Sequence, residues 1–458
     1  MADYRPDTKI LTLGPDYYDP VEAAPFPKCV PRFLNHRWAD RVGLSGDDAW
    51  WEKHFCRFEP LPENLTEPLA LRYHGHQFRV YNPDIGDGRG FTFAQLRDNC
   101  DRLLDLGTKG SGQTPYSRHA DGRLTLKGGV REVLATEMLE ALGVNTSKTF
   151  ALFETGEQLE RGDEPSPTRS SALTRLSHGH IRIGTFQLLA FFGEVENVRK
   201  LVRYCLQNLY SETPGADDGE NALRLFDLVS QATATLAASY MAAGFVHGVL
   251  NSDNINVIGE SFDYGPWRFT PDWEPEFTAA YFDHYGLYAF GRQPEAIHWD
   301  LAQFAGCMSL VTEAPPLSEM LAGWSARFED ALVDAMLGRL GVGSGNNDPE
   351  VAAALIKALA TREHPIDRVF FDWRGGHDPG PERYGSEPFR ELAKSLDGRE
   401  QPQSHPYWSD AQPCSMHIDE VEAIWSAIAD RDDWQPFDDK VNAIRRMGEA
   451  MEQDAPRN

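Results

Sequence analysis

The feature that most constrains the fold is a change of hydrophobic pattern partway along the chain. Residues from about 70 to 160 carry short apolar runs separated by glycine-rich turns, which is typical of strands. From Ile183 onward, long apolar stripes recur at helical spacing, as over 195–209 and 223–243. A chain with strands first and helices later is expected to adopt an α+β fold.

The length of the chain supports the same division. At 458 residues it exceeds the usual size of one domain, so two lobes are expected. We predict an N-terminal wrapping segment over 1–60, a small strand-rich lobe over 61–160 and a mainly helical part over 161–458. Further helices are predicted near 300–312, 317–338, 349–361 and 418–429, a surface excursion over 375–407 and a frayed end from 441.

Composition excludes several classes of protein. No apolar run reaches the ~20 residues that a membrane-spanning helix needs, and the first residues carry acids and no apolar signal core. We therefore expect a cytoplasmic protein whose six cysteines are free, because none forms a C-x-x-C pair. The net charge of −26 argues against nucleic-acid binding, since phosphates would be repelled. A monomer is the default expectation.

One segment carries the strongest chemical pattern. Asp253 and Asn254 follow an apolar stretch, and Asp263 begins a later Asp-Tyr-Gly turn. Enzymes of the kinase type use this layout, in which an Asn and a later Asp-x-Gly hold metal ions at a nucleotide's phosphates. Such oxygen ligands suit Mg²⁺ or Mn²⁺. The alternative is a turn and hairpin in which these side chains only cap backbone groups.

A site of this type also needs a lysine for the phosphates and a helix-borne glutamate beside it. Lys109 follows a strand-like run and precedes Gly110, and Glu132 lies in the first turn of a helix predicted over 131–142. Taken alone, each is better explained as a surface charge. Their order and spacing ahead of Asp253 favour the functional interpretation.

Glycine-rich turns add candidate phosphate contacts. Gly86, Gly88 and Arg89 form a turn that could bind an anion, and Asp121 and Gly122 repeat the theme. Tight hairpin turns explain both stretches as well, and the two interpretations are compatible because phosphate-binding loops are themselves turns.

Two arginines, Arg175 and Arg182, stand seven residues apart beside two histidines. Arginine suits multidentate phosphate recognition. The alternative is that both pair with carboxylates on the surface of this acidic protein. The histidines lack further ligands at zinc-like spacing, so no zinc site is expected.

Together these motifs resemble one family, the selenoprotein O or YdiU family of kinase-like protein adenylyltransferases. The matches run in order from about residue 70 to residue 306. They include H-G-H-Q-F from His74, G-D-G-R from Gly86, K-G-x-G-x-T-P-Y-S-R from Lys109, H-x-R-x-G-T-F from His180, H-G-V-L-N-S-D-N from His247 and D-Y-G-P from Asp263. Each motif is weak alone, whereas the ordered set is specific.

The resemblance implies a bilobed protein-kinase-like fold, with a small strand-rich nucleotide lobe, a larger mainly helical lobe and N- and C-terminal extensions. It implies that ATP binds inverted relative to ordinary kinases, so that AMP passes to a Ser, Thr or Tyr hydroxyl of a protein. By motif, Asp253 is the proton acceptor, and Asn254 and Asp263 hold Mg²⁺ or Mn²⁺. The nucleotide would be contacted by Gly86, Gly88, Arg89, Lys109, Asp121, Gly122, Glu132, Arg175, Arg182 and Asp263.

Other activities stay open at this point: uridylyl transfer from UTP, kinase-like phosphotransfer, or an inactive nucleotide-binding scaffold. Val249 stands where a kinase loop carries its catalytic Asp, which disfavours phosphotransfer. The chain also departs from the family pattern. Arg79 replaces a usual Gly after H-Q-F, and neither the family's N-P-K motif nor its terminal cysteine is recognisable in the last third.

Overall fold

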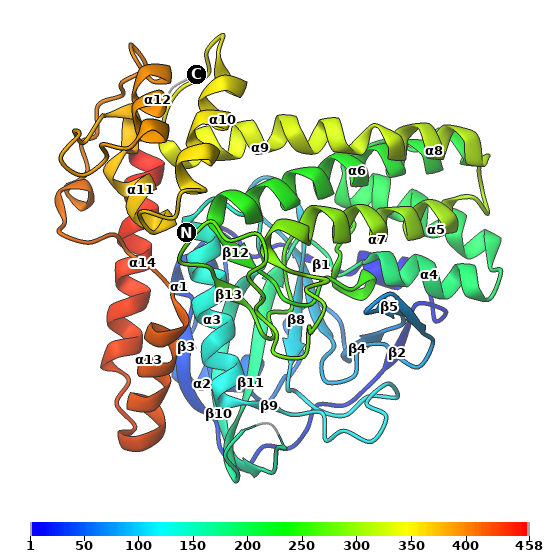
Figure 1. Ribbon diagram of the computed structural model, residues 1–458. Helices are drawn as coiled ribbons and strands as arrows, with labels where there is room; N and C mark the ends of the chain where they lie inside the picture. Colours follow the sequence, from blue (N-terminus) through cyan, green and yellow to red (C-terminus); the bar gives the residue numbers. More distant parts are fainter. Residues whose placement is uncertain (1, 163, 456–458) are drawn as a thin grey trace.

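Strands occupy the first part of the chain and helices the rest in this computed structural model, which describes residues 2–162 and 164–455 (Figure 1). An antiparallel sheet forms in the order β2 (Tyr18–Pro20), β4 (Leu69–Leu71), β7 (Thr92–Arg97), β8 (Leu103–Lys109), β11 (Thr168–Ser177), β10 (Lys148–Leu159) and β3 (Val30–Leu34). Two short strands extend it, since β1 (Pro6–Asp7) pairs with β7 and β9 (Leu124–Thr125) with β11. The expected mixture of a sheet and helices is confirmed.

The alternation of side chains along β8 gives the sheet two different faces. Leu104 and Leu106 enter an aromatic cluster with Phe93. Asp105 and Lys109 have the opposite parity, so they point to the other face. That face carries the polar groups described below. The predicted division at residues 60 and 160 stays a prediction, although β11 joins the sheet from beyond residue 160.

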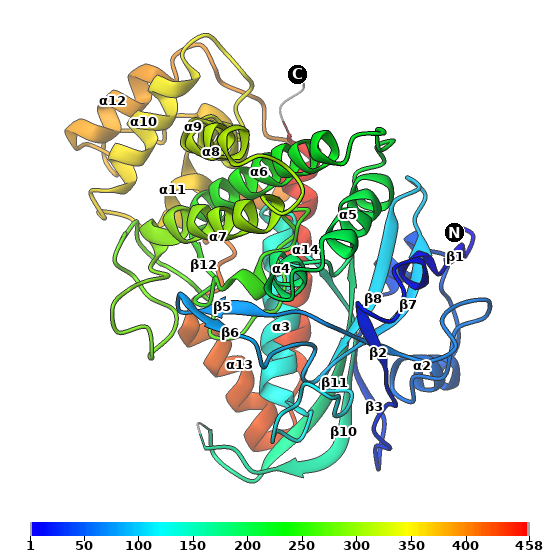
Figure 2. The same ribbon diagram turned by 90° about the vertical axis from the view of Figure 1, so that its right-hand side faces the viewer.

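Helix α3 (Leu126–Ala141) lies against β10 and β11 (Figure 2). It was expected to begin at residue 131, and it begins earlier because the Thr125 side chain caps it by accepting from Gly128 N. Gly129 permits close packing on the sheet, since a Cβ there would be 2.5 Å from Leu152 Cδ1. The helix gives way to Gly143, whose φ of +78° is left-handed as the predicted stop requires.

The central helices are α4 (Ile183–Phe191), α5 (Val195–Tyr204), α6 (Asp218–Ala243), α7 (Gln293–Met308), α8 (Ala314–Ala322) and α9 (Trp324–Leu340). Asp217 caps the start of α6, and Gly244 ends it with a φ of +67°. The single helix predicted over 317–338 is instead two helices, since the chain turns at Gly323 between α8 and α9.

The last third contains α10 (Asp348–Leu359), α11 (Ile366–Asp372), α12 (Glu387–Ser395), α13 (Ile418–Arg431) and α14 (Gln435–Gln453). The predicted surface excursion over 375–407 contains α12. The expectation of a frayed end from 441 is wrong for residues 441–453, which belong to α14 and run alongside α3 (Figure 1), while residues 456–458 lie outside the described part of the chain. Phe437, Val441 and Ile444 are buried along α14, so its apolar stripe holds it in place.

The N-terminal segment contains α1 (His36–Arg41) and α2 (Asp48–Phe55). The expectation that every cysteine is free is wrong, because Cys29 and Cys56 form a disulfide with Cα atoms 6.1 Å apart. Sequence spacing did not reveal this pair because β3 and α2 become neighbours only in the folded chain. Among the described residues, every helix is too short or too polar to span a bilayer.

Two small strand pairs complete the frame of the site. β5 (Gly75–Gln77) and β6 (Val80–Asn82) form a hairpin, called the β5–β6 hairpin below. β12 (Phe245–Val246) pairs with β13 (Arg268–Phe269). The intervening residues 247–267 carry the motif with Asp253 and Asp263. Within this stretch, Asn256 makes an isolated antiparallel bridge to Arg182.

Candidate functional site

A cavity of about 290 Å³ opens between the polar face of the sheet and the loop that carries Asp253. It brings together residues from stretches far apart in the sequence. Its lining comprises Tyr73, Gln77, Ile85, Gly86, Asp87, Gly88, Arg89, Gly90, Thr108, Lys109, Tyr116, Ser117, Arg118, Ala120, Arg175, Arg182, Asp253 and Asp263.

Lys109 is the centre of a buried charge cluster in this cavity. Its Nζ lies 2.6 Å from Glu132 Oε2 and 2.8 Å from Asp263 Oδ1. Lys109 stands at the end of β8 and Glu132 in the second turn of α3, so the packing of that helix on the sheet creates the pair. Removing one partner would leave a buried charge without compensation.

Arg175 on β11 extends the cluster and is itself held from behind. Its Nη1 lies 3.6 Å from Asp263 Oδ1, while its Nε donates to His180 Nε2 at 3.0 Å. Burial lowers the pKa of His180, so the ring is neutral and its Nδ1 hydrogen faces Asp105 Oδ2 at 3.3 Å. Nη1 makes no hydrogen bond within the described residues, although it also lies 3.9 Å from Glu132 Oε1.

Asp263 is the carboxylate that the two cations share. Burial acts to raise its pKa, but Lys109, Arg175 and Arg89 outweigh burial and hold the pKa well below the usual range. Its φ of +64° is left-handed, which is uncommon for a residue other than glycine. The side chain therefore stays ionised and faces the cavity.

Arg182 is buried in the cavity wall beside Tyr73, whose ring centroid is 4.0 Å from the guanidinium carbon. Nη1 donates to the backbone oxygen of Asp253 at 3.1 Å, and Nη2 lies 3.4 Å from Asp87 Oδ1. Arg182 thus ties the start of α4 to the Asp253 loop and to the glycine-rich turn. It faces the cavity and also holds that wall together.

Asp253 occupies the opposite wall, in a short 3₁₀ turn over Ser252–Asn254. Burial raises its pKa to about 6, against the opposing charge of Arg182. Its Oδ1 has no hydrogen-bond partner in the described part of the chain. Gly75 lies against it, since a Cβ on Gly75 would be only 2.9 Å from that oxygen. A carboxylate in this state is suited to accept a proton.

Asn254 lies just outside the cavity lining, next to Asp253. Its Nδ2 donates to Val249 O at 3.0 Å, which leaves its side-chain oxygen free. Asp263 keeps Oδ2 in addition to the Oδ1 that faces Lys109. These two oxygens fit a hard divalent cation. Within residues 2–162 and 164–455, no group of three His, Cys, Asp or Glu side chains could hold a metal alone.

The glycine-rich turn over 86–90 forms another part of the lining. Gly86 is required by the Tyr116 ring, since a Cβ would be 2.4 Å from it, and Gly90 by Thr108 O at 2.0 Å. Arg89 reaches the cavity from this turn. Its charge is one of those that lower the pKa of Asp263.

The second glycine turn also lies outside the lining, as Asn254 and Glu132 do. Asp121 pairs with Arg161, with 2.8 Å between Nη1 and Oδ2. Gly122 packs on Gly112, since a Cβ would be 2.2 Å from Gly112 O. Ala120 is the neighbouring residue that faces the cavity. Direct nucleotide contact by Asp121 and Gly122 stays a prediction.

Several contributors received no role from the sequence. His180 and Asp105 orient Arg175, and Gly75 gives Asp253 its space. The alternation of side chains along β8 could have predicted the position of Asp105, because residues 105 and 109 lie on the same face of the strand. Gly75 offered no such signal, because its neighbour Asp253 is distant in the sequence.

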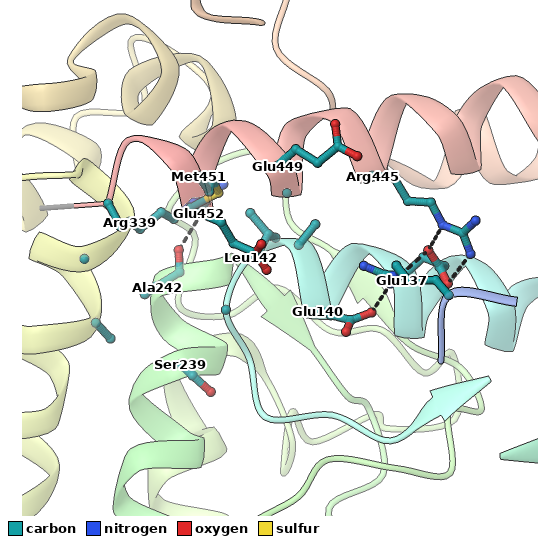
Figure 3. Close-up of a pocket in the computed structure, with 17 residues that line it drawn as sticks. Glu137, Glu140, Leu142, Ser239, Ala242, Arg339, Arg445, Glu449, Met451 and Glu452 are labelled. Atoms are coloured by element: carbon teal, nitrogen blue, oxygen red, sulfur yellow. Dashed lines mark hydrogen bonds and ion pairs between the residues drawn. The ribbon is translucent and has the colours of Figure 1, made fainter. Parts of the chain in front are cut away.

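A second cavity of about 390 Å³ lies behind α3, between α3, α6, α9 and α14 (Figure 3). There Arg445 Nε donates to Glu137 Oε2 at 2.7 Å, and Arg37 pairs with Glu140. Arg339 donates to Ala242 O and pairs with Asp367. This rear cavity contains none of the predicted site residues.

Known proteins resemble the chain over most of its length. The family profile described as "Protein adenylyltransferase SelO" matches residues 2–379. A "Protein nucleotidyltransferase YdiU" of Gloeobacter violaceus is 42% identical over 467 residues, covering 97% of this chain and 95% of that protein. Proteins of the same name are 39% identical in Synechocystis sp. (95% of this chain, 96% of that protein) and in Synechococcus elongatus (96% and 94%). The chain therefore belongs to the SelO family of protein adenylyltransferases.

Proposed function

We propose that this enzyme transfers AMP from ATP to Ser, Thr or Tyr hydroxyls of proteins and releases pyrophosphate, with Mg²⁺ or Mn²⁺ as the required cation. The observation that carries the proposal is the pairing of two walls in one cavity. One wall presents the cations Lys109, Arg175 and Arg182, and the other presents the buried carboxylate of Asp253, whose Oδ1 has no hydrogen-bond partner among the described residues. A triphosphate and a hydroxyl acceptor need these two environments side by side.

In the proposed reaction, the residues of the two cavity walls have different roles. Asp253 accepts the proton as the acceptor O–H bond breaks, and the acceptor oxygen bonds to the α-phosphorus. The bond between that phosphorus and the bridging oxygen breaks, and the electron pair leaves with pyrophosphate. Lys109, Arg175 and Arg182 balance the charge of the phosphates. The pKa of about 6 lets Asp253 be ionised near neutral pH and still accept a proton.

The cation would be held by Asn254 and Asp263, whose free oxygens have the right chemistry. When bound, it offsets negative charge on the triphosphate. Lys109 Nζ already contacts Asp263, so the carboxylate has a fixed position in the absence of a ligand.

The proposal includes a kinase-like division into two lobes and an ATP whose α-phosphate, not its γ-phosphate, faces Asp253. Val249 supports this orientation, because the position at which a kinase loop carries its carboxylate has an apolar side chain here. Asp253 is displaced along the loop from that position, so the proton acceptor lies elsewhere in the site.

The test is transfer of label from ATP labelled at the α or at the γ phosphorus, with Mg²⁺, Mn²⁺ or EDTA, and a mixed protein acceptor. Covalent α label that EDTA abolishes supports the proposal. Covalent γ label indicates phosphotransfer, and binding of ATP without either label indicates a scaffold. Because the relatives are named nucleotidyltransferases, α-labelled UTP is run in parallel, and a preference for UTP would replace adenylyl by uridylyl transfer.

A further inference from the structure

The β5–β6 hairpin lies directly beside the loop that carries the proton acceptor (Figure 2). His76 donates its backbone N–H to Ser252 Oγ at 2.7 Å, and Phe78 donates its backbone N–H to Asn251 Oδ1 at 3.0 Å. These bonds fix the hairpin against both residues that precede Asp253. Any hydroxyl that reaches Asp253 from outside therefore passes close to this hairpin.

The turn of the hairpin is held in a demanding conformation. Phe78 and Arg79 have φ values of 51° and 62°, in the left-handed region that usually needs Asn or Gly in such turns. The Phe78 ring packs on Tyr288, with centroids 5.1 Å apart, and Arg79 pairs with Glu295 at 2.8 Å. The hairpin is thus a fixed wall and not a loose flap.

Exposed apolar side chains gather on both sides of this wall. They form the aromatic band, which we define as Val80, Phe191, Phe192, Tyr281, Phe282 and Tyr285. Among the described residues, Leu11 is the one large exposed apolar side chain outside the band. Phe191 stacks on Tyr81 of β6 with centroids 5.5 Å apart, and Phe282 contacts Phe78 at 5.8 Å. Such a concentration of exposed apolar groups marks an interaction surface.

The cations near the band are already paired. Arg79 and Arg292 both contact Glu295, at 2.8 Å and 3.2 Å. Arg79 also lies over the Trp299 ring, 5.4 Å from its centroid. These two arginines are therefore not free to bind an acidic partner, and the band itself offers apolar contact. Val80 is 68% exposed, Tyr281 79% and Tyr285 92%, so each is free to gain contacts on binding.

The burial of Asp253 limits which kind of partner can reach it, because this residue is only 8% exposed. A flat folded surface cannot deliver a hydroxyl into such a recess, whereas an extended segment can. The hairpin also offers a strand edge. Because His76 and Phe78 direct their N–H groups to the catalytic loop, the register leaves the N–H and C=O of Tyr81 on the outer edge of β6. An extended segment can pair with such an edge.

We propose that the aromatic band is the docking surface for the acceptor protein, and that it binds an extended segment whose apolar side chains flank the modified hydroxyl. The inference rests on the proposed function, since it concerns the acceptor of the same site. Binding measured without transfer separates the two claims.

The test uses two synthetic peptide pools with a central Ser, Thr or Tyr and identical lysine ends. Flanking positions are Val, Leu or Phe in one pool and Gly, Asn or Gln in the other. Fluorescence anisotropy measures binding to the full chain in the presence of a non-hydrolysable ATP analogue. We expect the apolar pool to bind at least about tenfold more tightly, as burial of several apolar side chains should provide.

The matching variant replaces three exposed members of the band, Val80→Ser, Tyr281→Ser and Tyr285→Ser, and Leu11→Ser is the control. We expect the triple variant to lose about tenfold in affinity for the apolar pool, with unchanged affinity for the ATP analogue. The control should bind both pools as the parent does. Equal binding of the pools, or an unaffected triple variant, would overturn the inference.

Transfer of α label to the same pools decides the remaining outcomes. Preferential binding of the apolar pool without any transfer supports the docking surface and contradicts the proposed function. Equal transfer to both pools contradicts the docking surface and leaves the proposed function intact. If label appears only on a second copy of the chain, and the band variant prevents self-association, the occupant is another enzyme molecule and the inference is wrong.

Discussion

The front cavity at Lys109 and the rear cavity behind α3 differ in how their polar groups are satisfied. In the front cavity, Asp253 Oδ1 and Arg175 Nη1 have no hydrogen-bond partner among the described residues, and Glu132 Oε1 behind it has none either. In the rear cavity, which is the larger, Arg445 and Arg339 bond to Glu137 and Ala242 (Figure 3), and among the described lining residues Arg37 Nε is the one buried side-chain atom without a partner. Unsatisfied buried groups are costly, so their concentration in the smaller cavity marks it as the functional one.

The rear cavity is related to the site through α3, the helix that carries Glu132. It lies along the later turns of α3, the helix whose earlier turns carry Glu132, and α14 closes it from outside. The bond between Arg445 and Glu137 joins the end of the chain to that helix. Size alone would have selected the wrong cavity, and the rear ion pairs are better explained as structural supports.

The largest expected effect is a loss of AMP transfer when a carboxylate of the front cavity is removed. Asp263→Ala should lower AMP transfer at least about a thousandfold, because the cation loses an oxygen ligand and Lys109 loses a partner. Covalent α label measures the loss. Asp84→Ala, which removes an exposed carboxylate two residues before the glycine-rich turn over 86–90, is the charge-matched control and should retain activity. Normal transfer by the Asp263 variant would remove the site assignment.

Asp253→Asn is expected to change the free energy of unfolding by an amount that depends on pH. The native pKa of about 6 exceeds that of an unfolded Asp, so the protonated form is favoured by folding and stability is lost as pH rises through 6. Asn resembles the protonated group at every pH. The variant should match the parent near pH 4 and be more stable by up to about 3 kcal/mol above pH 7. Urea unfolding in EDTA measures this, and a pH-independent difference would contradict it.

Removing a rear ion pair should affect stability and spare the chemistry. Arg445→Ala leaves Glu137 buried with weaker compensation, so we expect the free energy of unfolding to fall by about 2 kcal/mol. Arg431→Ala is the control, since Arg431 is exposed and lies 3.7 Å from Asp433. ATP affinity should be unchanged in both. A large loss of affinity in the Arg445 variant would show that the rear support controls the front cavity.

The smallest expected effect concerns nucleotide discrimination. Arg175→Ala should weaken ATP binding about tenfold more than AMP binding, because the free Nη1 is suited to a phosphate that AMP lacks. Arg182→Ala is expected to act in the same direction, with added loss of stability because Arg182 also holds Asp253 and Asp87. Calorimetric titration with both nucleotides measures the ratio. Equal losses would rule out a role at the distal phosphates.

Local signals explain what could be predicted for the fold. Gly143 and Gly244 end α3 and α6 as their sequence positions predict, since only glycine enters the left-handed conformation without cost. The start of α3 was missed because two glycines inside it resemble a loop. Gly129 is there for close packing on Leu152, which sequence periodicity does not report.

The sequence by itself determined the chemistry of the site, because residue type fixes charge and ligand preference: a lysine, a glutamate, two arginines and the Asp-Asn and Asp-x-Gly motifs. Tertiary structure decided which of these meet. Lys109, Glu132 and Asp263 share one ion-pair cluster, whereas Asp121 pairs with Arg161 away from the cavity lining. The disulfide, the docking of α14 and the contact of Gly75 with Asp253 also required the folded chain. Each depends on contacts between residues that are distant in the sequence, and local sequence patterns do not identify those partners.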